Sequence, residues 1–309
     1  MGFTVEPTPI HRLERLSSRL GRTVFAIRED MTGFGLGGNK VRKLDYLVAD
    51  ALYKRADVLV TSAASNFSRN AAVAAKTCGL KLHVIIPGDP SGHNAASQSF
   101  FDQYEAVLHY KAADVPGGLA TAQAELVAEL SSHGDVVYEM PPGGSTEIGT
   151  LGYVRVFEQI VRFTEMTGTH FDNIVLATGS AGTQAGLVVG QCISGYPTRV
   201  IGMAICRASD VQRERVRTLA SSTAALLGVP FDEAKVLVDD RFLGDGYPIP
   251  SPDGDKGVRL FAHTEGLLLD RIYAGKAAAG LIHSASSGEI GAQENTLFVH
   301  TGGNGGLYY

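Results

Sequence analysis

The stretch Ile174-Val-Leu-Ala-Thr-Gly-Ser-Ala-Gly-Thr183 decides the fold class of this chain. It joins a β-branched apolar run to a turn of small residues, and a helical pattern follows. Three more apolar runs lead into turns of this kind, at residues 61–66, 141–145 and 300–303. In α/β folds such turns lie at the carboxyl ends of the strands, where ligands bind.

Short apolar runs alternate with longer helical patterns along the rest of the chain. The runs predict strands at residues 58–61, 82–86, 107–110, 136–139, 174–177, 200–205, 236–238 and 297–300. Helical spacing is seen in the stripe Val41, Leu44, Leu47, Val48 and Leu52 and in the stripe Ala122, Leu126 and Leu130. A further helix is expected from residue 145 through Glu165. This alternation predicts an α/β fold with parallel sheets covered on both faces.

The composition indicates a globular protein and argues against several kinds of partner. The 309 residues are 44% hydrophobic, and the net charge of −5 disfavours a nucleic-acid partner, which usually meets a basic excess. No stretch reaches the roughly 18–20 apolar residues that span a bilayer, and residues 1–15 lack the core of a signal peptide. We therefore expect a cytoplasmic protein that binds neither a membrane nor a nucleic acid.

Cysteines and histidines give no sign of a disulfide or a metal. Cys78, Cys192 and Cys206 lie far apart without CxxC spacing, so we expect buried reduced thiols. The nine histidines are scattered, and no metal site is expected. His300 is more typical of a packing residue than of a metal ligand.

A lysine follows a glycine pair in Gly37-Gly38-Asn39-Lys40. A partly desolvated lysine near the positive end of a helix has its pKa lowered from about 10.4 and becomes a better nucleophile. A P-loop would need Ser or Thr directly after the lysine, but Val41 follows, so the spacing excludes it. From local spacing alone, a solvated surface lysine remains the alternative.

The small residues from Gly179 to Thr183 suit an anion site. Their backbone N–H groups and the start of the following helix can face one phosphate group. A dinucleotide site is the rival, but the spacing G-x-x-G-x-x-x-G differs from G-x-G-x-x-G, and no clear acidic residue ends a strand about 20 residues later. A single phosphate fits better, although tight packing of a helix on a sheet also selects glycine.

Other polar residues at the turns have structural alternatives. Ser65 and Asn66 stand where side chains commonly cap a helix. A lone tyrosine such as Tyr273 is more often a packing residue, and Thr301 in the last turn decides nothing by itself.

Together and in this order, these segments resemble the family that contains D-cysteine desulfhydrase and 1-aminocyclopropane-1-carboxylate (ACC) deaminase, which are pyridoxal-phosphate (PLP) enzymes of fold type II. The resemblance runs from about Pro9 to the last residue. It is carried by residues 28–33, 37–44 (GGNKVRKL), 65–66, 143–145, 152–153, 177–180, 265–267 and 300–303. It implies two open, twisted, mostly parallel sheets with helices on both faces. It also implies a homodimer whose large PLP-binding domain comprises residues 1–42 and 153–309, with a small α/β domain of residues 43–152 inserted.

The resemblance also implies roles for individual residues. Lys40 is similar to the lysine that holds PLP as a Schiff base and moves a proton at the substrate Cα. Ser65 is similar to the serine that meets the substrate carboxylate or assists proton transfer, and Tyr273 and Tyr247 resemble the paired active-site tyrosines. The implied cofactor-binding residues, besides Lys40, are Asn66, Thr178, Gly179, Ser180, Ala181, Gly182, Thr183 and Thr301.

Two positions favour one activity within this family. ACC deaminases place a glutamate after the tyrosine that matches Tyr273 and lack the threonine, whereas this chain has Ala274 and Thr301. A neutral hydroxyl at the cofactor's ring nitrogen suits β-elimination, because a leaving group departs and no long-lived carbanion is needed. The implied substrate is a small amino acid, D-cysteine or a related β-substituted alanine, which gives pyruvate, ammonia and sulfide or another leaving group. ACC deamination to 2-oxobutyrate and ammonia is the alternative, and a non-catalytic PLP- or nucleotide-binding protein is a third hypothesis.

Three positions depart from the family pattern. Phe67 replaces a polar His or Gln close to the expected substrate carboxylate, so the substrate and its chirality stay open. Ala181 replaces a common glycine, which we expect to be a mild change. Tyr247 lies in Gly-Tyr-Pro-Ile-Pro instead of Tyr-Gly-x-Pro. The pattern also does not decide whether the reaction is elimination or β-replacement. Nor does it decide which of Lys40, Ser65 and Tyr273 moves which proton.

Overall fold

The computed structural model describes residues 1–92, 95–112 and 118–303, so the last six residues of the predicted large domain lie outside the described residues. The strands are β1 (Ile10–Arg12), β2 (Thr23–Arg28), β3 (Val58–Ser62), β4 (Lys81–Pro87), β5 (Val107–Lys111), β6 (Val137–Glu139), β7 (Asn173–Thr178), β8 (Arg199–Ala204), β9 (Leu237–Asp239) and β10 (Asn295–His300). Every strand that the sequence predicts is present, with ends that differ by at most two residues.

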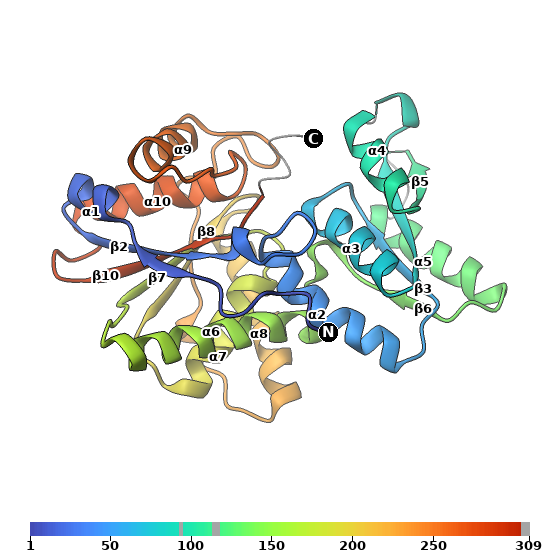
Figure 1. The fold of residues 1–309 in the computed structure, drawn as a ribbon, viewed down its shortest axis with the longest axis horizontal. Coiled ribbons are helices and arrows are strands. Elements are labelled where there is room, and N and C mark those ends of the chain that lie inside the picture. Colours follow the sequence, from blue (N-terminus) through green and yellow to red (C-terminus); the bar gives the residue numbers. More distant parts are fainter. Residues whose placement is uncertain (93–94, 113–117, 304–309) are drawn as a thin grey trace.

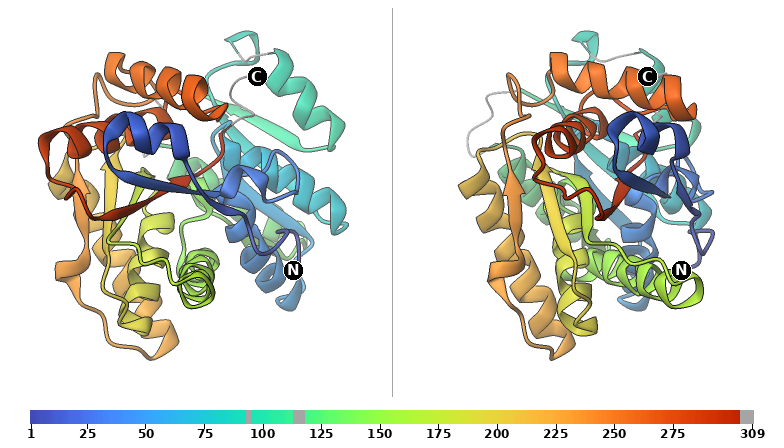
Figure 2. Two further views of the ribbon diagram at one scale, coloured as in Figure 1. Left: turned by 60° about the vertical axis from the view of Figure 1, so that its left-hand side comes forward. Right: turned by 90° about the vertical axis from the view of Figure 1, so that its left-hand side faces the viewer.

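The strands form two sheets that lie side by side (Figures 1 and 2). The larger sheet has the order β1-β2-β10-β7-β8-β9, and the smaller has the order β5-β4-β3-β6. Within the described residues, β1 and β2 pair antiparallel and every other neighbouring pair is parallel. The predicted α/β fold with two mostly parallel sheets is confirmed.

Helices cover both faces of each sheet. They are α1 (Glu14–Leu20), α2 (Asn39–Tyr53), α3 (Asn66–Thr77), α4 (Ala95–Gln103), α5 (Gly118–Ser132), α6 (Glu147–Thr167), α7 (Gly182–Ser194), α8 (Ser209–Leu227), α9 (Pro252–Glu265) and α10 (Ala274–Ser287). On the larger sheet, α6, α7 and α8 pack on one face and α1, α9 and α10 on the other (Figure 1). On the smaller sheet, α2, α3 and α4 pack opposite α5. Such covering explains why the parallel strands are apolar on both sides.

Some sequence expectations need correction. In the predicted stripe of α2, four residues are fully buried, but Leu52 is 37% exposed because the last turn of the helix extends past the core. Cys78, Cys192 and Cys206 are free, as expected, yet they are only partly buried. None of the helices in the described part of the chain combines the length and apolar character that a membrane crossing requires.

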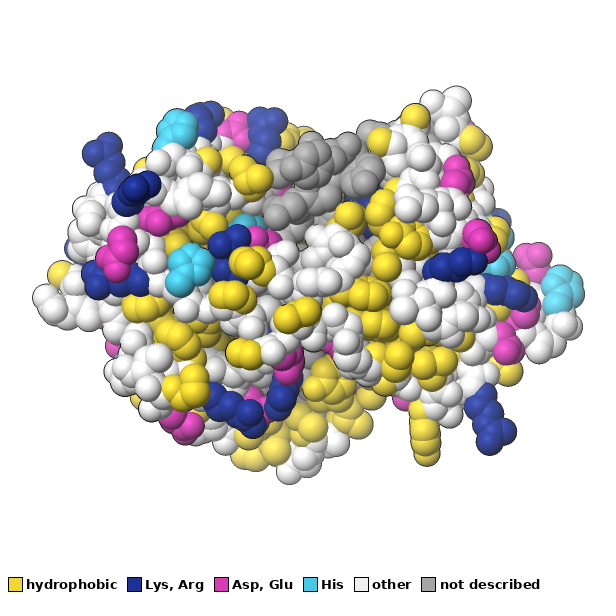
Figure 3. Space-filling view, viewed as in Figure 1, with side chains coloured by type: hydrophobic (Ala, Val, Ile, Leu, Met, Phe, Trp, Pro, Cys, Tyr) yellow, Lys and Arg dark blue, Asp and Glu magenta, His cyan; other side chains and the backbone are white. Residues whose placement is uncertain are grey.

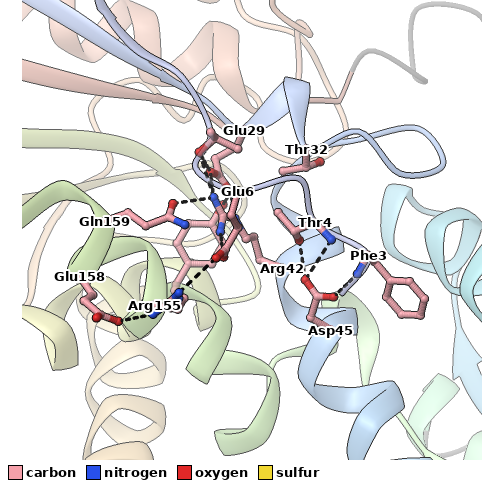
Figure 4. A network of polar contacts seen from close by, with 12 residues as sticks. Phe3, Thr4, Glu6, Glu29, Thr32, Arg42, Asp45, Arg155, Glu158 and Gln159 are labelled. Carbon is pink, nitrogen blue, oxygen red and sulfur yellow. Dashed lines mark hydrogen bonds and ion pairs between the residues drawn. The ribbon is translucent and has the colours of Figure 1, made fainter. Parts of the chain in front are cut away.

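A buried polar network fixes α2 against the larger sheet (Figure 4). Arg42 is 1% exposed, and its guanidinium donates to both carboxylate oxygens of Glu29, at 2.9 and 3.0 Å, just beyond β2. The same guanidinium donates to Glu6 at 2.5 Å and to Gln159 on α6 at 3.0 Å. The N-terminal segment, α2 and α6 therefore meet at one cation. This junction sets the position of the first turn of α2.

Candidate active site

A cavity of about 220 Å³ opens at the carboxyl ends of the strands, between the two sheets. It is lined by the first turn of α2, the turn after β3, the turns after β7, β8 and β10, and the segment before α10. The predicted site residues that line it are Lys40, Ser65, Asn66, Thr178, Gly179, Ser180, Ala181, Thr183, Tyr247, Tyr273 and Thr301. Gly182 is the exception and lies behind the wall. The fold thus brings together turns that are more than 230 residues apart.

Lys40 stands in the first turn of α2 and faces this cavity. Gly38 precedes the helix with a φ of 91°, and a Cβ there would lie 2.9 Å from the carbonyl oxygen of Thr301, so only glycine fits. The backbone N–H of Asn39 donates to that same carbonyl at 2.9 Å. Burial lowers the pKa of Lys40 to about 8, against an opposing contribution from Asp270. A sizeable fraction of this amine is therefore neutral and nucleophilic near pH 8.

The glycine-rich turn after β7 leads into the N-terminus of α7, where backbone N–H groups lack partners within the helix. Ala181 has a φ of 74°, a conformation that is rare for residues with a side chain, so its replacement of glycine is not the mild change we expected. The hydroxyl of Thr183 accepts from the Asn39 amide at 2.9 Å, which ties this turn to the segment of Lys40. The turn has the geometry of a cradle for one anionic group.

A second lysine, which the sequence analysis missed, lies directly behind the cradle. Lys43 is fully buried, and its ammonium donates to the Gly143 carbonyl at 3.0 Å and to Ser145 Oγ at 3.1 Å. Ser145 Oγ in turn donates to Ser180 Oγ at 2.9 Å and accepts from the Gly182 N–H at 3.3 Å. A Cβ on Gly182 would lie 2.7 Å from the Lys43 amine, so glycine lets this side chain approach the turn, where burial and then Lys40 lower the pKa of Lys43 well below its ordinary value. The only sequence signal was position: three residues after Lys40, on the same face of the helix.

The hydroxyl of Ser65 caps a helix, and the residue also lies at the cavity, where its predicted role toward the substrate stays a prediction. The hydroxyl caps α3 by accepting from the Ser68 N–H at 3.3 Å. The Ser65 N–H in turn donates to the Ser68 hydroxyl at 2.8 Å, which completes a capping box. Ser65 also lines the cavity beside Asn66. Phe67 is fully buried and packs against Gly144 in the core of the smaller sheet, and it also belongs to the lining of the cavity.

Two tyrosines meet across the cavity from Ser65. The hydroxyl of Tyr273 donates to the hydroxyl of Tyr247 at 3.1 Å, although the residues are 26 positions apart. Burial, followed by the neighbouring Tyr247, raises the pKa of Tyr273 far above its ordinary value. Tyr273 therefore stays neutral at ordinary pH, with its hydroxyl bonded to that of Tyr247.

Asp270 is a cavity residue that the sequence analysis missed. Burial raises the pKa of its carboxyl group, and three backbone N–H groups at the start of α10 donate to it, from Ile272, Tyr273 and Ala274, at 2.6–3.0 Å. The signal that could have found it is an acidic residue just before a helix. His300, by contrast, is buried behind the cavity wall and accepts from the Gly302 N–H at 3.3 Å.

These features fit a PLP molecule. Its aldehyde needs a partly neutral amine such as Lys40, and its phosphate needs a helix N-terminus with a small-residue turn such as that before α7. This fit concerns the kinds of groups that line the cavity, so the roles of individual residues stay predictions.

Comparisons with known proteins point to the same chemistry. A family model described as pyridoxal-phosphate dependent enzyme matches residues 2–302. A relative from Pyrococcus furiosus, which carries the provisional name 1-aminocyclopropane-1-carboxylate deaminase, is 37% identical over 98% of this chain and 91% of its own. The D-cysteine desulfhydrase of Yersinia pestis (strain Pestoides F) is 36% identical over 97% of this chain and 92% of its own.

A solved structure agrees with this placement. It is described as the ACC deaminase homologue and superposes with a TM-score of 0.89 at 36% identity, covering 97% of this chain and 90% of that one. The architecture is that of fold type II. This chain belongs to the family of pyridoxal-phosphate dependent enzymes, as a lyase that is similar to both the D-cysteine desulfhydrases and the ACC deaminases.

Proposed function

We propose that this protein catalyses PLP-dependent β-elimination on D-cysteine or a related β-substituted alanine, with release of pyruvate, ammonia and the leaving group. One observation carries the choice within the family. Ala274, the residue after Tyr273, is fully buried and carries no carboxylate, whereas Thr301 lines the cavity. Asp270 also lines the cavity, but its carboxylate accepts from three backbone N–H groups at and just before the start of α10, which hold it in place. A neutral hydroxyl at the cofactor suits elimination of a good leaving group.

The side chains of this protein would divide the work as follows. Lys40 would hold the cofactor covalently and take the proton from the substrate Cα, since its pKa of about 8 matches that task. When bound, PLP supplies the electron sink that makes this C–H bond acidic. Ser65 would orient the substrate carboxylate, and Tyr273 with Tyr247 would deliver a proton to the leaving group. Asn66, Thr301 and the turn of residues 178–183 would hold the cofactor.

The test is a comparison of two products from purified protein. We expect sulfide and pyruvate in equal amounts from D-cysteine, and no 2-oxobutyrate from ACC. L-Cysteine is the matched control for chirality, because sulfide from it alone would reverse the predicted stereochemistry. Serine, cysteate and diaminopropionate in both enantiomers would then define the leaving group. Production of 2-oxobutyrate without sulfide would contradict the proposal.

ACC deamination is the second candidate. It is favoured by a relative and a solved structure whose names refer to that activity, at 37% and 36% identity, against 36% for the D-cysteine desulfhydrase. The absence of a carboxylate at position 274 is the argument against it. Lys40→Ala should abolish both activities, together with the absorbance of the bound cofactor, and so distinguishes any PLP enzyme from a non-catalytic nucleotide binder.

We further propose the division into a large domain (residues 1–42 and 153–309) and an insert (residues 43–152). All four strands of the smaller sheet lie within the insert, and both boundaries fall inside helices, α2 and α6. A cytoplasmic homodimer that binds no nucleic acid is proposed as well. In support, acidic and basic side chains are interspersed on the face shown in Figure 3, and the net charge is −5. Sedimentation velocity would measure the mass of the assembly.

A further inference from the structure

A third lysine, Lys276 on α10, is fully buried next to the candidate active site. Its ammonium donates to the carbonyl oxygens of Leu243 and Gly246, both at 2.8 Å, and more weakly to that of Ile205 at 3.5 Å. Three donors thus meet three carbonyl acceptors, which is the full capacity of a lysine ammonium. A buried charge with this coordination is costly to place and points to a specific task.

The two carbonyls that accept from Lys276 at 2.8 Å, those of Leu243 and Gly246, belong to the segment that presents Tyr247. This segment, residues 240–250, runs between β9 and α9 without regular structure. Its own backbone bonds are short-range turns, such as Gly246 N–H to Leu243 at 3.4 Å and Ile249 N–H to Gly246 at 3.1 Å. Tyr247 is 51% exposed, so side-chain packing alone holds it weakly. The lysine supplies a long-range anchor on the N-terminal side of this tyrosine.

The same helix carries the partner of Tyr247. Tyr273 is the N-cap residue of α10, three positions before Lys276, and therefore one turn away on the same helix. Its backbone N–H donates to Asp270 at 2.6 Å, which fixes this end of the helix. Lys276 thereby couples the position of one hydroxyl of the pair to the position of the other. Its third acceptor, Ile205, is itself a residue of the cavity wall.

We propose that Lys276 is a positioning residue that aligns Tyr247 with Tyr273 for proton transfer. The inference rests on the proposed function, in which the tyrosine pair delivers a proton. Without the Lys276 side chain, the hydroxyl of Tyr247 should be misplaced and kcat should fall. Cofactor binding and the overall fold should be unchanged.

The experiment is a double-mutant cycle with Lys276→Met and Tyr247→Phe on the holoenzyme. Each single variant should lower kcat by about 100-fold or more with a KM change below about threefold, since one positioned acid contributes at least about 10²-fold. In the double variant the second substitution should add less than about twofold. Independent, multiplying effects would overturn the proposal, as would an unchanged kcat in Lys276→Met. Lys256→Met, an exposed lysine on α9, is the matched control and should behave as wild type.

A second measurement does not depend on the substrate. Hydrogen–deuterium exchange of a peptide covering residues 240–250 should be faster in Lys276→Met, while peptides from α7 stay unchanged. Equal exchange of the 240–250 peptide in variant and wild type would overturn the positioning role even if the substrate assignment is correct. If exchange of this peptide is faster in Lys276→Met but the wild-type protein is inactive on every substrate tested, Lys276 still anchors the segment and the proposed function is wrong.

Discussion

At the scale of single residues, the sequence predicted several side chains that line the cavity, but not the buried residues behind them. Lys40, Ser65 and Tyr273 belong to motifs with a recognisable order, so the sequence named them before any contact was known. Lys43 and Lys276 have no such signal. Each is fully buried because carbonyl or hydroxyl acceptors from distant turns surround its ammonium, and those acceptors come together only in the fold. Asp270 is similar, because its environment depends on where α10 begins.

The pKa of Lys40 leads to a prediction for cofactor loading. Only the neutral amine attacks an aldehyde, so the rate of PLP incorporation into the apoprotein should rise with pH and level off above a midpoint of about 8. Stopped-flow absorbance between pH 6.5 and 9.5 measures it. Asp270→Asn removes a charge that raises the pKa of Lys40, so its midpoint should shift to lower pH. A midpoint near the ordinary lysine value, 10.5, would show that Lys40 is not enclosed as described.

At the scale of elements, local patterns predicted eight of the ten described strands and located helices such as α2, α5 and α6, but not the long-range partners of these elements. The N-terminal strands β1 and β2 were missed: β1 is three residues long and lies at an edge, and β2 pairs with β10, which lies more than 260 residues later. In the same way, the pattern of α2 shows its apolar stripe but not the burial of Arg42. That burial depends on Glu29, Glu6 and Gln159, which three other segments supply.

The Arg42 network should dominate the stability of this junction. Arg42→Met leaves the carboxylate of Glu29 buried, with only the hydroxyls of Thr8 and Tyr153 as donors. Breaking a buried pair in this way costs about 3–5 kcal/mol of unfolding free energy. Arg162→Met removes an exposed ion pair with Glu158 on α6 and should cost at most about 1 kcal/mol. Urea denaturation of both variants measures the difference, and equal losses would contradict a structural role for the network.

The histidine pair on β4 and β5 predicts a loss of stability in acid. His83 and His109 stack, with ring nitrogens 3.0 Å apart, and burial lowers the pKa of both below 6.5; the charge of His109 lowers that of His83 further. Below pH 6.5 the unfolded chain binds more protons than the folded one, so stability falls as the pH drops from 6.5 through the lowered pKa values. Well above pH 6.5 the histidines are neutral in both the folded and the unfolded chain, so the pair adds no pH dependence there.

The double variant His83→Gln/His109→Gln isolates this contribution. Its urea midpoint should fall less than that of the wild type between pH 7 and pH 5. Parallel curves for the two proteins would mean that the histidines titrate alike in the folded and unfolded chains. His133→Gln, an exposed histidine beyond α5, serves as the control and should follow the wild type.

At the scale of the whole molecule, the cavity exists only because the two sheets meet there. The turn after β3 contributes Ser65 and Asn66 from the smaller sheet, while the turns after β7 and β10 contribute residues from the larger one. The sequence predicted both groups of turns, since each follows an apolar strand. It could not show that β10, the last strand, inserts between β2 and β7. This insertion lets the carbonyl of Thr301 accept from the backbone N–H of Asn39, next to Lys40.

A ligand shared by both sheets should stabilise both when it binds. Because PLP would bind the folded chain and not the unfolded one, its removal should lower the thermal midpoint, by an amount that grows with affinity as RT ln(1 + [L]/Kd). Hydrogen exchange should then quicken both in residues 63–70 and in residues 178–186, whereas α9, which contributes no cavity residue, should not respond. Faster exchange in the 178–186 turn alone would mean that the cofactor is held by the larger sheet and that Asn66 has no part in binding it. Restoring PLP to the apoprotein should reverse the change, which separates loss of the cofactor from irreversible damage during its removal.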